Sequence, residues 1–312
     1  MTQPPLVSIV LATFNRLHYL RPSLDSVFAQ TFQDWQLIIA DDGSDSETTS
    51  YLATLADLPR VKVLRLTHTG KPAVVRNAAL RQALGEYVAF MDSDDLWLPK
   101  KLEIQLASLR RRSGCRWGQT TFVLVDPCGA SIKEMPAADG WILEKLLKTE
   151  TAIALPSVVA ERTLIEEVGG FDEELVTGED YDLWLRLAAQ SEVDAVDQPL
   201  TLVTRHQEHY ANEATAIRNV IRVLDKVLSS DNIGELDPIV RKQRATFAVL
   251  LARSYVSTGH RVSALGTVLS TAPRSWRYQE WWSGALRAIA SALAPETMRR
   301  AARRYRSRRT TS

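Results

Sequence analysis

Short apolar runs alternate with amphipathic segments through the first hundred residues. The apolar runs are rich in Val, Ile and Leu and lack polar alternation, which is typical of strands buried on both faces. These runs are residues 6–12, 36–40, 61–66 and 87–91. Segments with helical periodicity lie between them, at residues 19–28, 47–56 and 72–84. The repeated strand–helix–strand order predicts an α/β fold, a mostly parallel sheet flanked by helices.

The pattern changes twice further along the chain. From about Cys115 it predicts shorter strands, with a turn at residues 126–129 and a helix at residues 142–148. After Arg205 and His206 the chain is helical to its end, and residues 245–272 resemble one helical hairpin. We therefore expect a first domain of residues 1–210 and a C-terminal helical region of residues 211–312.

Composition excludes several classes of protein. The 312 residues are 45% hydrophobic and 24% charged, which excludes a disordered, collagenous or coiled-coil chain. The net charge of +1 gives no reason to expect a nucleic-acid partner. The two cysteines are too few for a disulfide scaffold, and no stretch of about 18 apolar residues occurs. The first apolar run lacks a basic start, so we expect a strand rather than a signal peptide and a cytoplasmic protein.

Polar residues follow each of the four predicted strands. In open parallel sheets the ligand crevice lies beyond the carboxyl ends of the strands, so these residues are expected to share one rim. The five carboxylates among them would repel one another unless a positive group lay between them. They belong to Asp41, Asp42, Asp92, Asp94 and Asp95. A divalent cation is the natural candidate for that positive group.

Two acidic motifs each have two interpretations. In residues 92–95, oxygen ligands at alternate positions suit Mg²⁺ or Mn²⁺, but an Asp there could also cap a following helix. In residues 41–44, a carboxylate could accept hydrogen bonds from a base or ribose. Asp-Gly is also a common turn, and Ser44 or Asp45 could cap the next helix.

Two further segments combine charge with a helix start. Lys71 and Pro72 begin a helix whose free N–H groups could bind an anion, with Arg76 one turn further on. Arg76 could equally pair with a surface carboxylate. On a helix starting near residue 179, Asp180 shares a face with Trp184, so it would point into the protein or a cleft. Acids in a first helical turn also stabilise helices without any catalytic role.

In chain order these motifs resemble glycosyltransferase family 2, whose members have the GT-A fold. The resemblance covers about residues 6–206 and rests on Thr-Phe-Asn-Arg, Asp-Asp-Gly-Ser, Gly-(x)5-Arg-Asn, Asp-Ser-Asp-Asp-Leu-Trp, Gly-Gly-Phe-Asp and Glu-Asp-Tyr-Asp-Leu-Trp. It implies a Rossmann-like sheet with a C-terminal helical extension. It also implies a bacterial polysaccharide-assembly enzyme.

The resemblance assigns roles to individual positions. It implies that Asp180 is the general base with Glu179 beside it, and that Asp94 binds the metal. His206 could reach the metal or the diphosphate, or could be a packing residue. The donor-binding residues would be Ala12, Thr13, Asn15, Asp41, Asp42, Lys71, Arg76, Asp92, Ser93 and Asp95.

The reaction implied is inverting transfer of a sugar from a nucleotide diphosphate, most often UDP, to an acceptor hydroxyl, with Mg²⁺ or Mn²⁺ as cofactor. A sugar-1-phosphate nucleotidyltransferase would place a Gly-rich loop after the first strand, whereas residues 12–16 contain no glycine. A non-catalytic module that binds a nucleotide sugar or saccharide would be expected to have lost Asp94 or Asp180.

The C-terminal segment, residues 276–309, combines an apolar stripe with a basic run. The stripe recurs at helical spacing and consists of Tyr278, Trp281, Trp282, Ala285, Leu286, Ile289 and Leu293. After Pro295 come seven Arg between Arg299 and Arg309. The stripe could lie on the inner face of an anionic membrane, where the acceptor would be a lipid-linked saccharide. It could instead pack on the catalytic domain, with the Arg run as a solvated tail.

Overall fold

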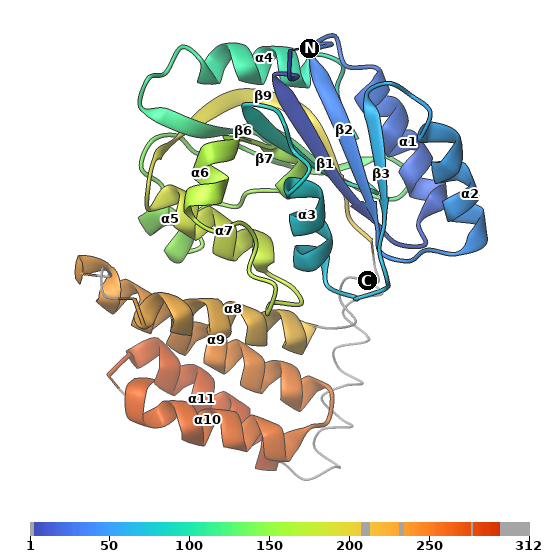
Figure 1. The fold of residues 1–312 in the computed structure, drawn as a ribbon. Coiled ribbons are helices and arrows are strands. Elements are labelled where there is room, and N and C mark those ends of the chain that lie inside the picture. The colour runs from blue at the N-terminus through green and yellow to red at the C-terminus, as the bar shows by residue number, and fades with distance from the viewer. Residues whose placement is uncertain (1–2, 207–212, 231–233, 276, 294–312) are drawn as a thin grey trace. The chain divides into compact units, whose positions relative to one another are not determined.

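The computed structural model describes residues 3–206, 213–230, 234–275 and 277–293. The chain divides into two compact units, Met1–His209 and Tyr210–Ser312, which are considered one at a time. Figure 1 shows a sheet flanked by helices in the first unit and helices alone in the second.

One sheet organises the first unit. Its strand order is β3-β2-β1-β4-β8-β6-β9-β5, and β7 pairs with β6. The four predicted strands are confirmed and run parallel to one another, as β1 (Val7–Thr13), β2 (Trp35–Asp41), β3 (Val61–Arg65) and β4 (Tyr87–Asp92). The remaining strands are β5 (Leu96–Trp97), β6 (Cys115–Val125), β7 (Ser131–Met135), β8 (Val158–Glu161) and β9 (Glu192–Thr204).

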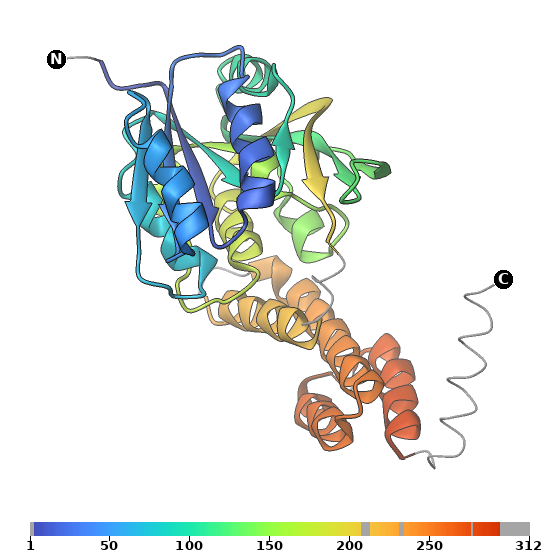
Figure 2. The ribbon, with the colours of Figure 1, turned by 90° about the vertical axis from the view of Figure 1, so that its right-hand side faces the viewer.

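Seven helices join these strands within the described part of the first unit. They are α1 (Leu17–Phe28), α2 (Ser46–Leu55), α3 (Pro72–Leu80), α4 (Lys101–Leu109), α5 (Leu143–Leu147), α6 (Arg162–Glu167) and α7 (Glu179–Ala188), with a 3₁₀ turn at Leu155–Ser157. Asp45 caps α2 by accepting a hydrogen bond from the Thr48 N–H, and Pro72 occupies the first turn of α3. Figure 2 shows α1 and α2 covering one face of the strands.

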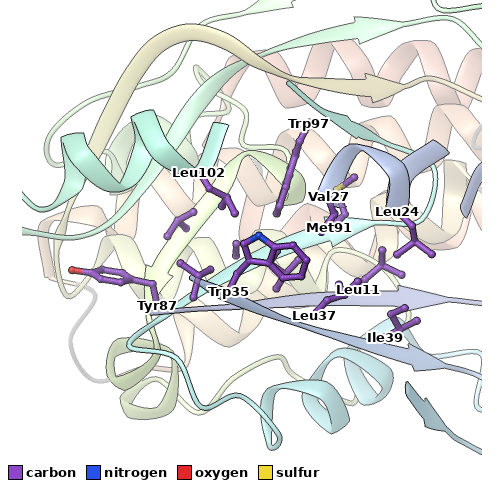
Figure 3. Close-up of a cluster of buried hydrophobic side chains, with 14 of the residues drawn as sticks. Leu11, Leu24, Val27, Trp35, Leu37, Ile39, Tyr87, Met91, Trp97 and Leu102 are labelled. Atoms are coloured by element: carbon purple, nitrogen blue, oxygen red, sulfur yellow. The ribbon is translucent and has the colours of Figure 1, made fainter. Parts of the chain in front are cut away.

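The core lies between α1, α2, α4 and the face of the sheet that carries alternate residues of β1 and β2 (Figure 3). Leu11, Leu37 and Ile39 of the strands are fully buried against Leu24 and Val27 of α1. Each such side chain contributes about 1.5–3 kcal/mol relative to an exposed one. This packing therefore fixes the positions of β1 and β2, and with them the strand ends that follow.

Two expectations about the first unit were wrong in detail. β3 is not buried on both faces, because it is the edge strand and leaves Lys62 and Arg65 exposed. The helix predicted over residues 72–84 ends at Leu80, because the chain must turn to pass close to β1 at Gly85. A Cβ at Gly85 would lie 2.6 Å from the Ser8 nitrogen, closer than real Cβ atoms come.

The described part of the second unit consists mainly of helices. Its helices are α8 (Glu213–Leu228), α9 (Asp237–Ser257), α10 (Arg261–Ser275) and α11 (Gln279–Leu293), with a 3₁₀ turn at Gly234–Leu236. α9 and α10 form the predicted hairpin. In the part of the chain that the structure describes, no helix is long and apolar enough to cross a membrane.

The apolar stripe of α11 forms two faces rather than one. Trp281 and Ala285 are buried in the core of the helical unit with Val249 of α9. Trp282, Leu286 and Leu293 are exposed. A stripe as wide as the predicted one spans more of the helix circumference than one packing partner covers. Pro295 and the Arg run lie outside the described residues.

Candidate active site

The ends of three parallel strands bring the predicted site residues together. In the β1–β2 pairing Thr13 lies opposite Asp41, and in the β1–β4 pairing Ala12 lies opposite Asp92. These four residues therefore lie side by side at the carboxyl edge of the sheet, as the strand pattern predicted. The Thr13 hydroxyl is buried and has no hydrogen-bond partner among the described residues.

Asp41 and Asp42 organise the loop after β2. The Asp41 carboxylate accepts a hydrogen bond from the Ser44 N–H at 3.2 Å. The Asp42 carboxylate accepts hydrogen bonds from the N–H groups of Thr69 and Gly70, at 2.8 Å and 2.9 Å, and from the Thr69 hydroxyl. Both carboxylates are buried. Asp42 thus ties the end of β2 to the loop that follows β3.

An aromatic pair lies beside this loop. The ring of Phe14 stacks on the ring of His68, with centroids 4.1 Å apart and planes 19° from parallel. The Nδ1 atom of His68 lies 2.9 Å from the Asp42 carbonyl oxygen. Asn15 adopts a positive φ of 49°, donates to the Ser44 hydroxyl and accepts from the Asp45 N–H. We did not predict Phe14 or His68 as site residues, although both directly follow predicted strands.

The acidic run after β4 is distributed among different partners. Asp92 accepts a hydrogen bond from Arg76 at 2.7 Å, and Asp94 forms an ion pair with Arg16. Asp95 is buried and accepts a hydrogen bond from the Thr204 N–H of β9. Burial, together with the charges of Asp92 and Asp94, raises the pKa of Asp95 well above its usual range. Ser93 is also buried.

These acids do not cap the next helix. α4 begins at Lys101, eight positions after Ser93, and its N-cap residue is Lys100 without a side-chain cap bond. The alternative interpretation of the motif as a helix cap is therefore wrong. Two of the charges instead face cations of the chain itself, since Asp94 pairs with Arg16 and Asp92 pairs with Arg76.

Asp94 and His206 are the residues that could hold a metal ion. The Nε2 atom of His206 lies 3.1 Å from Oδ2 of Asp94. Two ligands about 2.1 Å from an octahedral ion, at right angles, are about 3 Å apart, so this pair fits neighbouring coordination positions. Over the residues that the structure describes, no three acidic, His or Cys side chains gather closely enough to enclose a metal. The remaining positions would thus fall to substrate oxygens and water.

Lys71 and Arg76 both lie on α3 or at its start, but they face different groups. The Lys71 ammonium donates to the Glu173 carbonyl oxygen at 3.1 Å. Arg76 is 8% exposed and donates to Asp92 and, at 2.5 Å, to Glu179 of α7. Arg76 therefore pairs with the buried carboxylate of Glu179 and the partly exposed carboxylate of Asp92, rather than with a surface carboxylate as the sequence allowed.

Asp180 lies in the first turn of α7, after Gly178, whose φ is 77°. It shares a face with Trp184, as predicted, and both line a cavity of about 430 Å³. The other lining residues are Lys133, Met135, Leu146, Thr149, Glu150, Thr151, Ala152, Ile153 and Tyr181.

The surroundings of Asp180 tune its acidity. Burial and the charge of Glu179 raise the pKa of Asp180 to about 7, against the opposing effects of Arg76 and the Tyr181 N–H. A carboxylate with this pKa is about half ionised at neutral pH, so it can both take up and release a proton there. The site therefore combines a base beside a cavity with a carboxylate-rich strand edge, and Arg76 connects the two.

Comparison with known proteins identifies relatives of the chain. The family model of glycosyl transferase family 2 matches residues 8–127. The UDP-Glc:alpha-D-GlcNAc-diphosphoundecaprenol beta-1,3-glucosyltransferase WfgD of Escherichia coli is 31% identical over 192 residues, which are 62% of this chain and 73% of WfgD. An uncharacterized glycosyltransferase of Rickettsia felis is 29% identical, but the chain spans only about a third, 32%, of its length.

Solved structures share the fold at lower identity. TarS of S. aureus, residues 1–349 in complex with UDP, has a TM-score of 0.64 and 18% identity, covering 92% of this chain and 89% of TarS. The mannosyltransferase PcManGT of Pyrobaculum calidifontis, in complex with GDP-Man and Mn²⁺, has a TM-score of 0.59 and 16% identity, covering 92% of this chain and 86% of its own. The expected GT-A fold of the catalytic unit is thus confirmed.

Proposed function

The chain belongs to glycosyltransferase family 2, and we propose that it is an inverting enzyme that moves a sugar from a nucleotide diphosphate to an acceptor hydroxyl. One observation carries this proposal above the others. Asp180, with a pKa of about 7, lines a cavity and is linked through Glu179 and Arg76 to Asp92 at the strand edge. A base and a nucleotide site in that relation are what one displacement at the anomeric carbon requires.

We assign the donor to the edge formed by β1, β2 and β4. The Phe14–His68 stack offers a nucleobase an aromatic surface, and the Thr13 hydroxyl offers a polar contact without a competing partner in the described chain. A UDP-sugar is the donor we favour, because WfgD uses UDP-Glc according to its name and TarS was solved with UDP.

We assign a divalent cation, Mg²⁺ or Mn²⁺, to Asp94 and His206. When bound, such a cation neutralises charge that develops on the leaving diphosphate. Arg16 pairs with the same Oδ2 oxygen that faces His206, so the guanidinium and a metal ion would compete for that oxygen. The Mn²⁺ in the PcManGT structure supports a cation in this fold.

Asp180 would accept the proton of the acceptor hydroxyl as its oxygen attacks the anomeric carbon. Attack from the face opposite the diphosphate inverts the configuration, so an α-linked donor gives a β-linked product. The cavity beside Asp180 would hold the acceptor, and its volume of about 430 Å³ is within the range of small-molecule sites. Lys133, Met135 and Leu146 would contact that acceptor.

We propose a lipid-linked saccharide as the acceptor, since the WfgD name gives a diphosphoundecaprenol-linked sugar. The exposed residues Trp282, Leu286 and Leu293 of α11, with the Arg-rich sequence after them, would contact the inner face of an anionic membrane. Flotation of the full-length chain with phosphatidylglycerol vesicles, compared with a Leu286→Ser/Leu293→Ser variant, tests this contact. No flotation of the unchanged chain would rule it out.

Calorimetry of UDP, GDP, dTDP and CMP, with and without Mn²⁺, tests the donor site. We expect one diphosphate to bind in a metal-dependent manner and Asp94→Ala to abolish that dependence. Glu166→Gln, which removes an exposed carboxylate of α6 paired with Arg162, is the matched control and should bind as the unchanged chain does. If the folded wild-type chain bound no nucleotide, a non-catalytic saccharide-binding module would replace the enzyme as the preferred function.

A further inference from the structure

Arg76 joins three elements that are distant in the sequence. It lies on α3, donates through Nη2 to Asp92 at the end of β4, and donates through Nη1 to Glu179 at the start of α7. The distances are 2.7 Å and 2.5 Å, and the Arg76 side chain is 10% exposed. Of the ion pairs within the described chain, these two connect the strand edge with the helix that carries Asp180.

The guanidinium is held on its remaining side as well. Its central carbon lies 5.6 Å from the ring centroid of Phe171, which packs edge-on against Phe90 of β4. The Nε atom is buried without a hydrogen-bond partner in the described chain. Turning Arg76 toward a nucleotide would leave the buried Glu179 carboxylate and the partly exposed Asp92 carboxylate unpaired, which is strongly unfavourable. This geometry argues against the direct nucleotide contact that the family resemblance implies.

The residue after Glu179 is the base, so fixing Glu179 also fixes the first turn of α7. Several charged or polar groups act on Asp180. From its own helix these are Glu179 and the Tyr181 N–H, from α3 Arg76, and from β4 Asp92. Lys133 and Glu150 lie across the cavity. Glu179 and Asp92 disfavour ionisation of Asp180, whereas Arg76 favours it.

We propose that Arg76 is a positioning residue, which clamps the first turn of α7 to the end of β4 and holds Asp180 ionised at the cavity, without contacting the nucleotide. This rests on the proposed function, because it assumes that Asp180 is the base. Two consequences of opposite sign follow. Loss of the Arg76 charge should shift the acid limb of activity to higher pH. Loss of the Glu179 charge should shift it to lower pH.

The test is the pH profile of UDP release from a UDP-sugar that the wild-type chain turns over, with water as the acceptor. We expect the pH at the midpoint of the acid limb to be about 1 unit higher in Arg76→Gln than in wild type, and lower by a similar amount in Glu179→Gln. Arg76→Lys keeps the charge and should restore the wild-type midpoint. Arg81→Gln, which removes an exposed arginine beside Glu173 at the end of the same helix, should leave the profile unchanged.

Nucleotide affinity separates this role from direct binding. UDP should bind Arg76→Gln within about threefold of wild type, whereas a residue that contacts the nucleotide would lose tenfold or more. Lower activity in both variants without opposite shifts, or a tenfold loss of UDP affinity, would overturn the proposal.

A measurement that needs no turnover keeps the two proposals apart. The difference in Tm between each background and its Asp180→Asn partner reports the titration of Asp180 alone. Because its pKa is raised in the folded state, the stability that protonated Asp180 contributes is lost as the pH rises toward 7. Compared with wild type, this loss of stability should continue to a higher pH in Arg76→Gln and should be complete at a lower pH in Glu179→Gln. Identical curves of Tm difference against pH in the wild-type, Arg76→Gln and Glu179→Gln backgrounds would overturn the proposed role of Arg76. Opposite shifts in a chain without any turnover would contradict only the proposed enzymatic function.

Discussion

The Oδ2 atom of Asp94 faces two nitrogen-bearing side chains at once, the Nε2 atom of His206 at 3.1 Å and the guanidinium of Arg16. A metal ion bound at this oxygen would meet the positive charge of Arg16. Arg16 is therefore expected to compete with a divalent cation for this carboxylate.

Removing the competitor should strengthen metal binding. We expect Arg16→Gln to bind Mn²⁺ about fivefold more tightly than wild type, the upper range for a partly exposed ion pair. Isothermal titration with Mn²⁺ alone measures this. The control is Arg21→Gln, because Arg21 lies on α1, the helix that Arg16 precedes, and packs over the Tyr51 ring of α2. Equal Mn²⁺ affinity in wild type and Arg16→Gln would show that Arg16 does not compete with the cation for the Asp94 carboxylate.

The stacked pair beside Asp42 predicts a contribution to nucleotide affinity. Phe14→Ala removes one ring of the stack and should weaken UDP binding by about tenfold, the value of an aromatic pair of about 1.5 kcal/mol. The Tm should change little, because Phe14 is 38% exposed. Trp141→Ala, which removes another exposed aromatic side chain, should leave UDP affinity unchanged. A similar loss in both variants would argue against a base platform at Phe14.

Gly85 marks a close approach that tolerates no side chain. In Gly85→Ala the new Cβ would meet the backbone of β1 at Ser8, so we expect a loss of about 1–3 kcal/mol in the free energy of unfolding. Urea denaturation measures this loss. Gly114→Ala is the matched control, because nothing lies within 4 Å of its Cβ position, and it should change stability by less than about 0.5 kcal/mol. Equal stability of the two variants would mean that β1 and Gly85 are not in contact.

Lys101 predicts a pH dependence of stability. Its ammonium is fully buried above the Trp97 ring at 4.2 Å, and burial lowers its pKa well below the usual range. The unfolded chain then binds a proton that the folded chain does not, so wild-type stability falls as pH decreases from 10.5 toward the folded-state pKa. Lys101→Met has no ammonium at this position, so it lacks this pH-dependent loss of stability.

Thermal unfolding at pH 8 and pH 10 measures the effect. The advantage in Tm of Lys101→Met over wild type should be larger at pH 8 than at pH 10. Lys145→Met, which removes an exposed lysine of α5, is the control. A Tm difference that does not depend on pH would contradict a buried, titrating Lys101.

Local sequence patterns predicted the parts of the fold that depend on neighbours in the chain. The Val- and Ile-rich runs predicted β1 and β4, and the shared face of Asp180 and Trp184 followed from their spacing on a helix starting near residue 179. Strand ends in a parallel sheet meet at one edge, so the grouping of Asp41 with Asp92 was also predictable.

Contacts between distant segments were not predictable in the same way. The two partners of Arg76 lie 16 and 103 residues away, and only the packing of α7 against β4 decides that they converge. The positive charge expected among the carboxylates was assigned to a metal alone, because nothing in the sequence placed Arg16 beside Asp94. Likewise, the exposure of β3 follows from its place at the edge of the sheet, which the β3 segment itself does not reveal.

The most direct test of the account is the pH dependence of UDP release in wild type and Asp180→Asn, each saturated with Mn²⁺ and donor. We predict a wild-type rate that rises with pH to a plateau, with a midpoint near the Asp180 pKa of about 7. Asp180→Asn should bind UDP with unchanged affinity but release it from the donor about 10²- to 10⁴-fold more slowly, without that midpoint. An Asp180→Asn variant that keeps the wild-type rate and pH profile would show that Asp180 is not the base.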